Sequence, residues 1–385
     1  MRNRPAFGLV LAIMLILSAC GSTPASSPGS PSPTNRASTN PAPPPGDSSI
    51  PAEDGTRTGW ILLEHVGANA PNGSSPANGP EGVSLWLIRP DGNDLHELAP
   101  GVPMDGKTNP VWSRDGEHIA FESVQPRRLV YETDVAGSAP VPTSRSCSGV
   151  LVEPNPCIER LPAYSPDGNQ LATVVNTLSG LAPIKGIEVI YLRHRYAENE
   201  RCSQSATCFH LGFSLDATRV ATSTASIEGL SWSPDGSQMA YYRVAKDLSG
   251  KPLGSELWIV DANGTNPHPI PLPDGLTAGD PDWSPDSSLI VFSSEPFHDW
   301  DDAGLPNTAD VYTVRPDGTD LRQLTHDGGS GAPSWTSDGK ILFSSERELW
   351  LMDADGSNAA PVFPDGLPLW GEETGSSYGY WQPVP

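Results

Sequence analysis

One short stretch of this 385-residue chain gathers residue types that could bind a metal ion or a polar ligand. It runs Glu295-Pro-Phe-His-Asp-Trp-Asp-Asp302 and holds four carboxylates, a histidine and a tryptophan. Carboxylates suit Ca²⁺, and a tryptophan ring beside them can hold a basic or sugar ligand. The same composition also describes a solvated acidic loop, which is the interpretation that we favour. The candidate ligand residues here are His298, Asp299, Trp300, Asp301 and Asp302.

His326 is a further candidate, because it follows the end of an expected strand at Leu324-Thr325 and should reach the same face of the fold. A lone histidine at such a place is more often a surface polar residue than a ligand. Only His65, His298 and His326 could converge on that face as metal ligands. Nothing in the sequence brings them together, so we assign no metal ligand and no cofactor beyond the Ca²⁺ considered above.

Familiar catalytic signatures are missing from the chain. It has no Gly-x-Ser-x-Gly elbow for a nucleophilic serine, no His-Glu-x-x-His zinc motif and no glycine-rich phosphate loop. We therefore assign no catalytic residue and favour a protein without enzymatic activity. The alternative that stays open is a metal-assisted lyase or hydrolase that acts on polysaccharide with the same face.

Five cysteines are present, and we expect four of them to pair as disulfides. With Cys20 set aside for the N-terminal region, Cys147, Cys157, Cys202 and Cys208 remain, and four cysteines allow three pairings. We expect the local pairs, 147 with 157 and 202 with 208, because each would close a loop too polar to pack by itself. A metal site is the alternative, but neither spacing is Cys-x-x-Cys. Such disulfides indicate an oxidising compartment.

A repeated turn indicates which fold positions these residues. The sequence Trp232-Ser-Pro-Asp-Gly236 has four further copies, with their aromatic residues 51 to 68 positions apart: Trp112-Ser-Arg-Asp-Gly116, Tyr164-Ser-Pro-Asp-Gly168, Trp283-Ser-Pro-Asp-Ser287 and Trp335-Thr-Ser-Asp-Gly339. Proline presets φ, aspartate caps the turn, and glycine adopts positive φ at its end. Each copy predicts a tight reversal after an aromatic strand, and a period of this size is typical of repeat folds.

Three more strand-length segments follow each turn. The second strand is apolar, as in Gln238-Met-Ala-Tyr-Tyr242, and the third, as in Leu257-Trp-Ile-Val260, usually runs into an Asp-Gly or Asn-Gly hairpin turn. A weaker fourth segment closes the unit, as in Leu321-Arg-Gln-Leu-Thr325. Four antiparallel strands in about fifty residues make one propeller blade.

Six third-strand segments can be counted, but the first unit has no turn of its own. We expect the C-terminal segment Tyr378-Gly-Tyr-Trp-Gln-Pro383 to supply the innermost strand of that unit. The sequence therefore predicts an all-β fold, a six-bladed β-propeller of four-stranded antiparallel blades. Its ring is closed by the C-terminal strand, which joins the N-terminal blade.

The order of these segments resembles the TolB-like propeller repeat. In that repeat, Trp-Ser-Pro-Asp-Gly is followed by an Ile-Ala-Phe type of strand, a Leu-Trp-Val-Asp type of segment, an Asp-Gly turn and Leu-Thr. The resemblance covers about Trp60 to Pro385. It implies the fold but no particular function, and we expect residues 59–385 to form one TolB-like β-propeller.

The N-terminal region is typical of an export signal followed by a tether. Residues 1–19 carry Arg2 and Arg4 and then an apolar run that is too short to span a membrane. The signal ends Leu17-Ser-Ala-Cys20-Gly21, which is similar to a bacterial lipobox; that resemblance implies cleavage before Cys20 and its acylation, for example with palmitate. An ordinary signal peptide with a chance cysteine is the alternative. Residues 20–58 are rich in proline and serine and should be a disordered tether.

The chain is strongly acidic. Its net charge is −23, and it becomes −25 once the signal with its two arginines is removed. Nucleic acid binding needs a basic face, so we expect no nucleic acid partner. Attachment to a membrane must then come from the lipid on Cys20 rather than from surface charge. Solubility is the simpler reason for this charge, and binding of a cation or a basic partner is the functional one.

The lengths of the expected loops suggest where a ligand would bind. Turns after the first and third strands are short and share one face of a propeller. Loops after the second strands are long and share the other face: His65–Ser84, Asn176–Gly186, Arg243–Ser255 and Ser293–Ala309. Binding residues gather on long loops of a rigid scaffold. We therefore predict an exported lipoprotein, anchored in the cell membrane on its extracytoplasmic side, that binds a protein or glycan of the envelope with this face. A purely structural envelope protein is the remaining alternative.

Overall fold

The structure is a computed structural model, and it describes residues 59–66, 83–98, 106–123, 129–143, 158–177, 187–195, 213–223, 225–246, 252–294, 309–345, 348–364 and 377–383. All of them belong to the second of two compact units, Asp47–Pro385, while the first unit, Met1–Gly46, lies outside the described residues. Every regular element among them is a β-strand. None of the described segments is a helix with the length and apolar character needed to cross a membrane.

The strands form six four-stranded sheets, numbered here along the chain, and all neighbouring strands are antiparallel. Sheet 1 joins β24 (Ser377–Trp381), β1 (Ile61–Val66), β2 (Val83–Ile88) and β3 (His96–Glu97). Sheet 2 holds β4 (Lys107–Trp112), β5 (His118–Ser123), β6 (Leu129–Asp134) and β7 (Val141–Pro142). Sheet 3 holds β8 (Ile158–Tyr164), β9 (Gln170–Thr177), β10 (Ile187–Arg195) and β11 (Phe213–Ser223).

The other three sheets follow the same pattern. Sheet 4 holds β12 (Ser226–Trp232), β13 (Gln238–Lys246), β14 (Pro252–Asp261) and β15 (His268–Pro269). Sheet 5 holds β16 (Gly279–Trp283), β17 (Ile290–Ser294), β18 (Asp310–Val314) and β19 (Arg322–Gln323). Sheet 6 holds β20 (Ser330–Trp335), β21 (Lys340–Ser345), β22 (Glu348–Asp353) and β23 (Ala360–Pro361).

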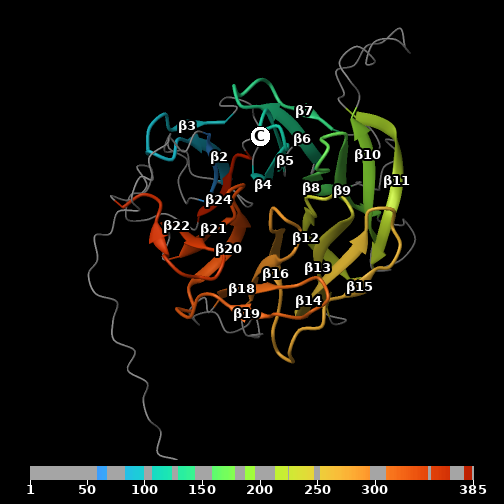
Figure 1. Cartoon of the computed structure of the whole chain (residues 1–385). Helices are drawn as coiled ribbons and strands as arrows, with labels where there is room; N and C mark the ends of the chain where they lie inside the picture. The colour runs from blue at the N-terminus through green and yellow to red at the C-terminus, as the bar shows by residue number, and fades with distance from the viewer. Residues whose placement is uncertain are drawn as a thin grey trace, which may run out of the picture. The chain divides into compact units, whose positions relative to one another are not determined.

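The first strand of each sheet lies toward a common centre, as Figure 1 shows. These inner strands contact one another in a closed cycle that runs β24, β4, β8, β12, β16, β20 and back to β24. The prediction of a propeller built from four-stranded antiparallel blades is confirmed. The predicted pairing of the chain's two ends is confirmed as well, because β24 pairs with β1 and places Trp381 opposite Ile61.

The hydrophobic core is divided among the seams between neighbouring sheets. Ile61 and Leu63 pack toward sheet 6, whereas Leu62 between them packs toward sheet 2. Successive side chains of a strand point to opposite faces, so a strand that is covered on both faces is apolar throughout. This is why the second strands have short continuous apolar runs instead of alternating patterns.

The repeated turn forms as predicted. In sheet 4, the Ser233 hydroxyl donates to Asp235 Oδ1 at 2.7 Å and accepts the backbone N–H of Gln238 at 2.9 Å. Gly236 closes the turn by donating its N–H to the carbonyl oxygen of Ser233 at 2.8 Å, with φ at 75°. In the one copy that ends in serine, Ser287 itself adopts φ of 60°. The turn therefore keeps its shape where glycine is missing.

Each of five inner strands contains a β-bulge that we did not predict. The residue three positions before the aromatic one adopts positive φ, between 47° and 55°, in Asn109, Leu161, Gly229, Asp280 and Ala332. Strand pairing shifts register at the same places. In four of the five a proline follows, which removes a backbone N–H from the ladder and suits a bulge. A residue-proline-residue-aromatic pattern before four of these turns could have revealed their bulges.

Candidate functional site

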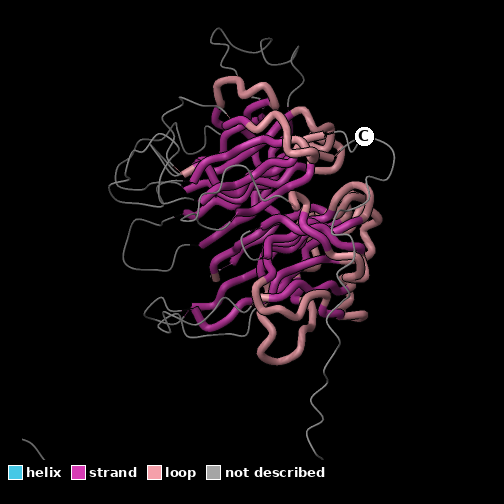
Figure 2. Tube along the Cα trace, turned by 90° about the vertical axis from the view of Figure 1, so that its left-hand side faces the viewer, coloured by secondary structure: helices cyan, strands magenta, loops and turns pink. Residues whose placement is uncertain are grey.

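The short turns lie together at one end of the ring, which we call the turn face. Antiparallel strands reverse direction at each step, so the turn after the first strand and the turn after the third strand share an end of each sheet. Figure 2 shows these turns, drawn in pink, gathered along one side of the strands. The turn face therefore carries the repeated Ser-x-Asp turns and the Asp-Gly or Asn-Gly hairpins.

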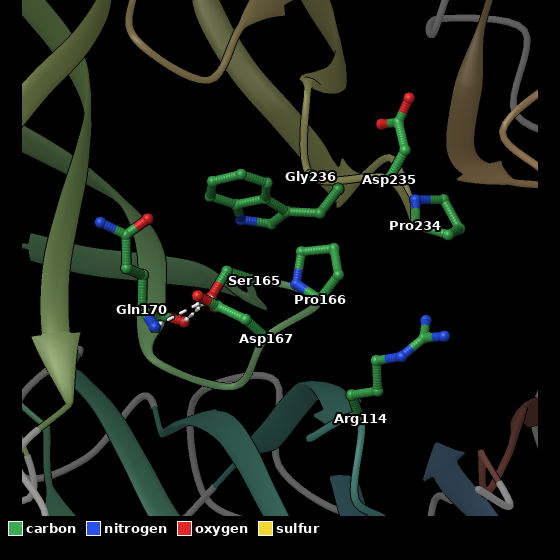
Figure 3. A pocket seen from close by; sticks show the side chains of 9 residues that line it. Arg114, Ser165, Pro166, Asp167, Gln170, Pro234, Asp235 and Gly236 are labelled. Atoms are coloured by element: carbon green, nitrogen blue, oxygen red, sulfur yellow. Dashed lines mark hydrogen bonds between the residues drawn. The ribbon is translucent and has the colours of Figure 1, made fainter.

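A pocket of about 480 Å³ opens on the turn face where sheets 2, 3 and 4 meet (Figure 3). We call it the turn-face pocket. Its lining comes from three copies of the repeated turn: Arg114; Ser165, Pro166, Asp167 and Gln170; and Trp232, Pro234, Asp235 and Gly236. Segments more than a hundred residues apart thus build one site. The sequence led us to expect the ligand on the opposite face.

Both aspartates of the pocket are held rigidly by their own turns. Asp167 Oδ1 accepts the Ser165 hydroxyl at 2.6 Å and the Asn169 N–H at 3.0 Å. Asp235 Oδ1 accepts the Ser233 hydroxyl at 2.7 Å and the Ser237 N–H at 2.9 Å. These hydrogen bonds, the serine hydroxyls first, lower the pKa of both carboxyl groups below the ordinary value. Both groups are therefore anions throughout the physiological pH range.

The same effect extends over the turn face. Hydrogen bonds from nearby donors are the leading reason for a lowered pKa in six further aspartates: Asp91, Asp261, Asp286, Asp317, Asp353 and Asp355. In Asp286 the first cause is the Ser284 hydroxyl, at 2.7 Å from Oδ1. The turn face is consequently a surface of fixed, ionised carboxylates.

Apolar side chains also line the pocket. Trp232 is 8% exposed, and its indole Nε1 has no acceptor in the part of the chain that the structure describes. Pro166 and Pro234 add two half-buried rings to the lining. A buried N–H without a partner costs free energy, and the indole Nε1 atoms of Trp283, Trp335 and Trp350 share this property with that of Trp232.

Arg114 is the cationic residue of the pocket lining. It is exposed and forms no ion pair with any described residue. In the turns of sheets 3, 4 and 5 the same position is Pro166, Pro234 or Pro285. The turn of sheet 2 thus keeps the shared backbone but presents an exposed positive charge.

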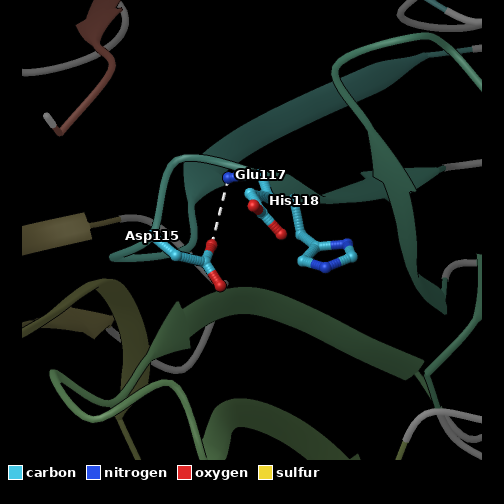
Figure 4. A group of neighbouring side chains, drawn as sticks. All are labelled: Asp115, Glu117 and His118. Carbon is cyan, nitrogen blue, oxygen red and sulfur yellow. Dashed lines mark hydrogen bonds between the residues drawn. The ribbon is translucent and has the colours of Figure 1, made fainter. Parts of the chain in front are cut away.

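Another group in the turn of sheet 2 could hold a metal ion. Asp115, Glu117 and His118 each place a ligand atom within 4.8 Å of the others. Figure 4 shows the three side chains. His118 Nδ1 also lies 3.8 Å from Glu132 Oε1, and Glu132 Oε2 accepts the Tyr164 hydroxyl at 2.7 Å. Carboxylate oxygens and an imidazole nitrogen suit a divalent cation. The sequence Asp115-Gly-Glu-His118 was the signal for this group, which we did not single out.

Carboxylates also join the sheets inside the ring. Glu64 of β1 accepts the Thr108 hydroxyl at 2.6 Å and the Asn109 N–H at 2.9 Å, both from sheet 2. Burial raises the pKa of Glu64 to about 7 in spite of these bonds. Asn109 is a bulge residue, and its side chain donates to Glu122 Oε2 at 3.1 Å.

Asp282 has the same role among sheets 4, 5 and 6. Its Oδ1 accepts the Ser231 hydroxyl at 2.8 Å, and its Oδ2 accepts the Trp335 N–H at 2.8 Å. Desolvation raises the pKa of this carboxyl group above the ordinary value. These groups bond to the protein's own backbone and hydroxyls, so their role is to hold the ring.

Most of the residues that we predicted as functional lie outside the described part of the chain. This applies to Cys20, Cys147, Cys157, Cys202, Cys208 and to His298, Asp299, Trp300, Asp301 and Asp302. His326 is described and lies exposed between β19 and β20. Its neighbour Asp327 accepts the Ser330 hydroxyl at 2.9 Å. His65 pairs with Ser84 in the β1–β2 ladder. A ligand site at these residues stays a prediction.

Comparison with known proteins by sequence finds partial matches. No protein-family model matches the chain. The Tol-Pal system protein TolB of Rhizorhabdus wittichii is 45% identical over 58 residues, which are 15% of this chain and 12% of that protein. TolB of Zymomonas mobilis is 40% identical over 80 residues, 20% of this chain and 16% of that protein. The matches thus span less than a fifth of the relatives' length.

Solved structures show the same kind of fold over most of the chain. TolB from Acinetobacter baumannii has a TM-score of 0.53 at 16% identity, with 84% of this chain and 66% of that chain covered. Hydrazine synthase from Kuenenia stuttgartiensis has a TM-score of 0.60 at 17% identity, covering 86% and 48%. A chain of a nidogen/laminin complex has a TM-score of 0.52 at 9% identity, covering 83% and 97%. This chain is therefore similar to TolB over short stretches of sequence and has a TolB-like β-propeller fold.

Proposed function

We propose that this protein is an exported, lipid-anchored and non-catalytic binding protein, whose six-bladed propeller binds a partner protein of the cell envelope through its turn face. The sheet cycle of six members supports the blade number. Similarity to proteins named for the Tol-Pal system supports an envelope location. The fold that this chain shares with a chain of a nidogen/laminin complex is consistent with protein binding.

The observation that carries this proposal is the combination of a pocket with fixed charge on one rigid surface. Serine hydroxyls and turn N–H groups hold Asp167 and Asp235 in place before any partner arrives. A partner therefore loses little free energy in ordering them, which favours affinity. Aligned carboxylates also attract a basic partner over a distance of about 8 Å at physiological ionic strength.

The N-terminal region supports the anchor. Acylation of Cys20 would hold the protein at the membrane, and residues 20–58 would let the propeller reach a partner. The variant C20S should lose membrane association in cell fractionation while its propeller stays folded. Membrane retention of this variant would contradict the lipid anchor.

Site-specific photo-crosslinking in cells tests the binding face. A photo-reactive residue in place of Pro234, on the turn face, should give a discrete adduct with a single protein. The same residue in place of Gln323, which is exposed on the outer strand β19, is the matched control and should give none. Equal adducts from both positions, or none from position 234, would overturn the proposal of a turn-face partner.

A second candidate function is a metal-assisted lyase or hydrolase of polysaccharide. The group formed by Asp115, Glu117 and His118 favours it, because a bound divalent cation can polarise a substrate or activate water. Metal analysis of the full chain after incubation with Zn²⁺, Mn²⁺ or Ca²⁺ tests this function. Stoichiometric metal that is lost in H118A, together with depolymerisation of a polysaccharide, would support it; the absence of either would remove it.

A further inference from the structure

We propose that residues 380–383, which we call the latch, reversibly hold the turn of sheet 2, so that closure of the ring controls partner binding at the turn face. This inference rests on the proposed protein-binding function and adds a regulation of the same surface. It is carried by hydrogen bonds between the latch and three residues, Trp60 before β1 and Trp112 and Gly116 of sheet 2.

Gln382 joins three distant parts of the chain. Its backbone N–H donates to the Trp60 carbonyl oxygen at 2.9 Å, and its side-chain Oε1 accepts the Trp60 N–H at 2.9 Å. Its side-chain Nε2 donates to the carbonyl oxygen of Gly116 at 2.7 Å. These bonds extend the pairing of the two chain ends beyond β24 and connect it to the turn of sheet 2.

The turn of sheet 2 differs from its equivalents because the latch covers it. A side-chain carbon added to Gly116 would lie 2.8 Å from the carbonyl oxygen of Pro383. The same atom added to the equivalent glycine of sheet 3, 4 or 6 would meet none of the described residues within 4 Å: Gly168, Gly236 and Gly339. Arg114 belongs to the covered turn and lines the turn-face pocket, so the latch sets the position of one wall of that pocket.

The tryptophan before the turn of sheet 2 shows the same difference. Trp112 Nε1 donates to the Tyr380 carbonyl oxygen at 3.1 Å. The indole N–H groups at the same place in sheets 4, 5 and 6 have no acceptor among the described residues: Trp232, Trp283 and Trp335. The latch thus holds the residue before the turn as well as the glycine near its end.

The latch lies at the free end of the innermost strand of sheet 1. Just before it, Gly379 is fixed, since its carbonyl oxygen accepts the Ser334 hydroxyl at 3.2 Å and a side-chain carbon there would lie 2.8 Å from Leu349. Strand pairing ends at Trp381, and the bonds of Gln382 hold the segment beyond it. Chain ends that few hydrogen bonds hold open locally at a low cost in free energy. The latch can therefore open while the rest of the ring stays closed.

The closed latch should favour binding of the partner. A turn that is already held in place needs no ordering when the partner arrives, whereas a released turn must first lose conformational freedom. Coupling between two sites is reciprocal, so a partner that needs the ordered turn would also stabilise the closed latch. Closure of the ring and occupation of the turn face then reinforce each other.

Hydrogen–deuterium exchange of the full chain tests the latch. Q382A removes both side-chain bonds of Gln382 and should speed amide exchange in residues 113–118 by about fivefold, the effect of losing one hydrogen bond. The turn at residues 233–238, whose glycine no described residue covers, is the internal control. Q323A changes an exposed glutamine of β19 and should leave both turns unchanged. Equal exchange of residues 113–118 in Q382A and the parent would overturn the inference.

Q382E separates the two side-chain bonds. At pH 7 a glutamate keeps an acceptor for the Trp60 N–H but has no donor for the Gly116 carbonyl oxygen. Exchange should therefore rise in residues 113–118 while residues 60–66 exchange as slowly as in the parent, whereas Q382A should speed both. If both variants change the two segments equally, the substitution causes a general loss of stability, and a latch on the turn is contradicted.

Photo-crosslinking in cells tests whether the latch controls binding. With the photo-reactive residue at position 234, Q382A should give about fivefold less adduct than the parent, the same factor as in the exchange measurement. Q323A should give as much adduct as the parent.

The two proposals fail in different ways. An adduct at position 234 that Q382A leaves unchanged, although residues 113–118 exchange faster, would remove the regulation and leave turn-face binding intact. If the parent gives no adduct while exchange responds as expected, the proposed protein-binding function is lost and the latch is reduced to a part of ring closure.

Discussion

Asp235 on the turn face and Glu64 inside the ring each accept hydrogen bonds from a hydroxyl and from a backbone N–H. Their pKa values nevertheless shift in opposite directions. At Asp235 the donors outweigh a small desolvation, and its pKa falls. At Glu64 desolvation outweighs the donors, and its pKa rises to about 7. Burial therefore decides which carboxylates can attract a ligand.

The comparison separates two roles for the acidic residues of this chain. Turn-face aspartates such as Asp167 and Asp235 are exposed and ionised, so they can act on a partner across solvent. Inner carboxylates such as Glu64 and Asp282 are enclosed by neighbouring sheets and use their oxygens to join them. The acidic residues behind the net charge of −23 therefore fall into two groups. Those on the turn face are available for binding, whereas those inside the ring are disfavoured as anions by desolvation.

The largest expected effect concerns the pH dependence of stability at Glu64. Its folded pKa of about 7 lies above the ordinary 4.5, so the folded state binds its proton more tightly than the unfolded chain does. The stability from this group is fully present below about pH 4.5 and is lost as the pH rises through about 7. A shift of this size corresponds to about 3 kcal/mol. E64Q should therefore raise the free energy of unfolding at pH 8 but not at pH 4.5, as measured with urea. An equal change at both pH values would contradict the buried, protonated carboxyl.

The next effect is at Asp282, which joins three sheets. D282A leaves the Ser231 hydroxyl and the Trp335 N–H without their acceptor, and we expect a loss of about 2 kcal/mol in unfolding free energy. D286A removes an exposed turn carboxylate of the same sheet and serves as the control. If both variants lose the same stability, the distinction between inner and turn-face carboxylates is wrong.

A smaller effect is expected from the turn serine that holds Asp235. S233A removes a buried hydroxyl that bonds both Asp235 and the start of β13, at a cost of about 1 kcal/mol. It should also raise the pKa of Asp235 toward its ordinary value, because the Ser233 hydroxyl is the first cause of the lowered pKa. Carboxyl ¹³C titration of Asp235 in the two proteins measures this shift. An unchanged titration would show that the hydroxyl does not hold the anion.

The smallest effect on stability is expected at Arg114. R114P changes an exposed residue with no ion pair among the described residues, so the unfolding free energy should stay within about 0.5 kcal/mol of the parent. Thermal unfolding of the two proteins tests this. A large loss would show that Arg114 supports the turn itself.

The local sequence was sufficient to predict the turns and most of the strands. The Ser-Pro-Asp-Gly residues dictate their own hydrogen bonds, since serine, aspartate and glycine act on backbone within five residues of themselves. The pairing of Tyr378–Pro383 with the first unit could also be predicted, because a unit without an inner strand needs one. The bulges at Asn109, Leu161 and their equivalents were missed, although the prolines after them gave a local signal.

The candidate site could not be predicted in the same way. Arg114, Asp167 and Trp232 belong to three repeat copies, and no pattern within one copy shows that their turns border a common pocket. Loop length predicted a ligand site on the opposite face instead. The site in the acidic stretch around His298 stays a prediction. The link from Tyr164 to Glu132 and His118 was equally hidden, since its members lie on two sheets.

The sequence by itself therefore determined the repeating unit, because hairpins and turns depend on contacts between near neighbours. Only the tertiary structure decided how the units meet. It set which turns share a pocket, which tryptophans have an indole N–H without an acceptor among the described residues, and which carboxylates are buried enough to hold a proton at neutral pH. These properties depend on desolvation and on distances between separate sheets, and both arise only when the ring is assembled.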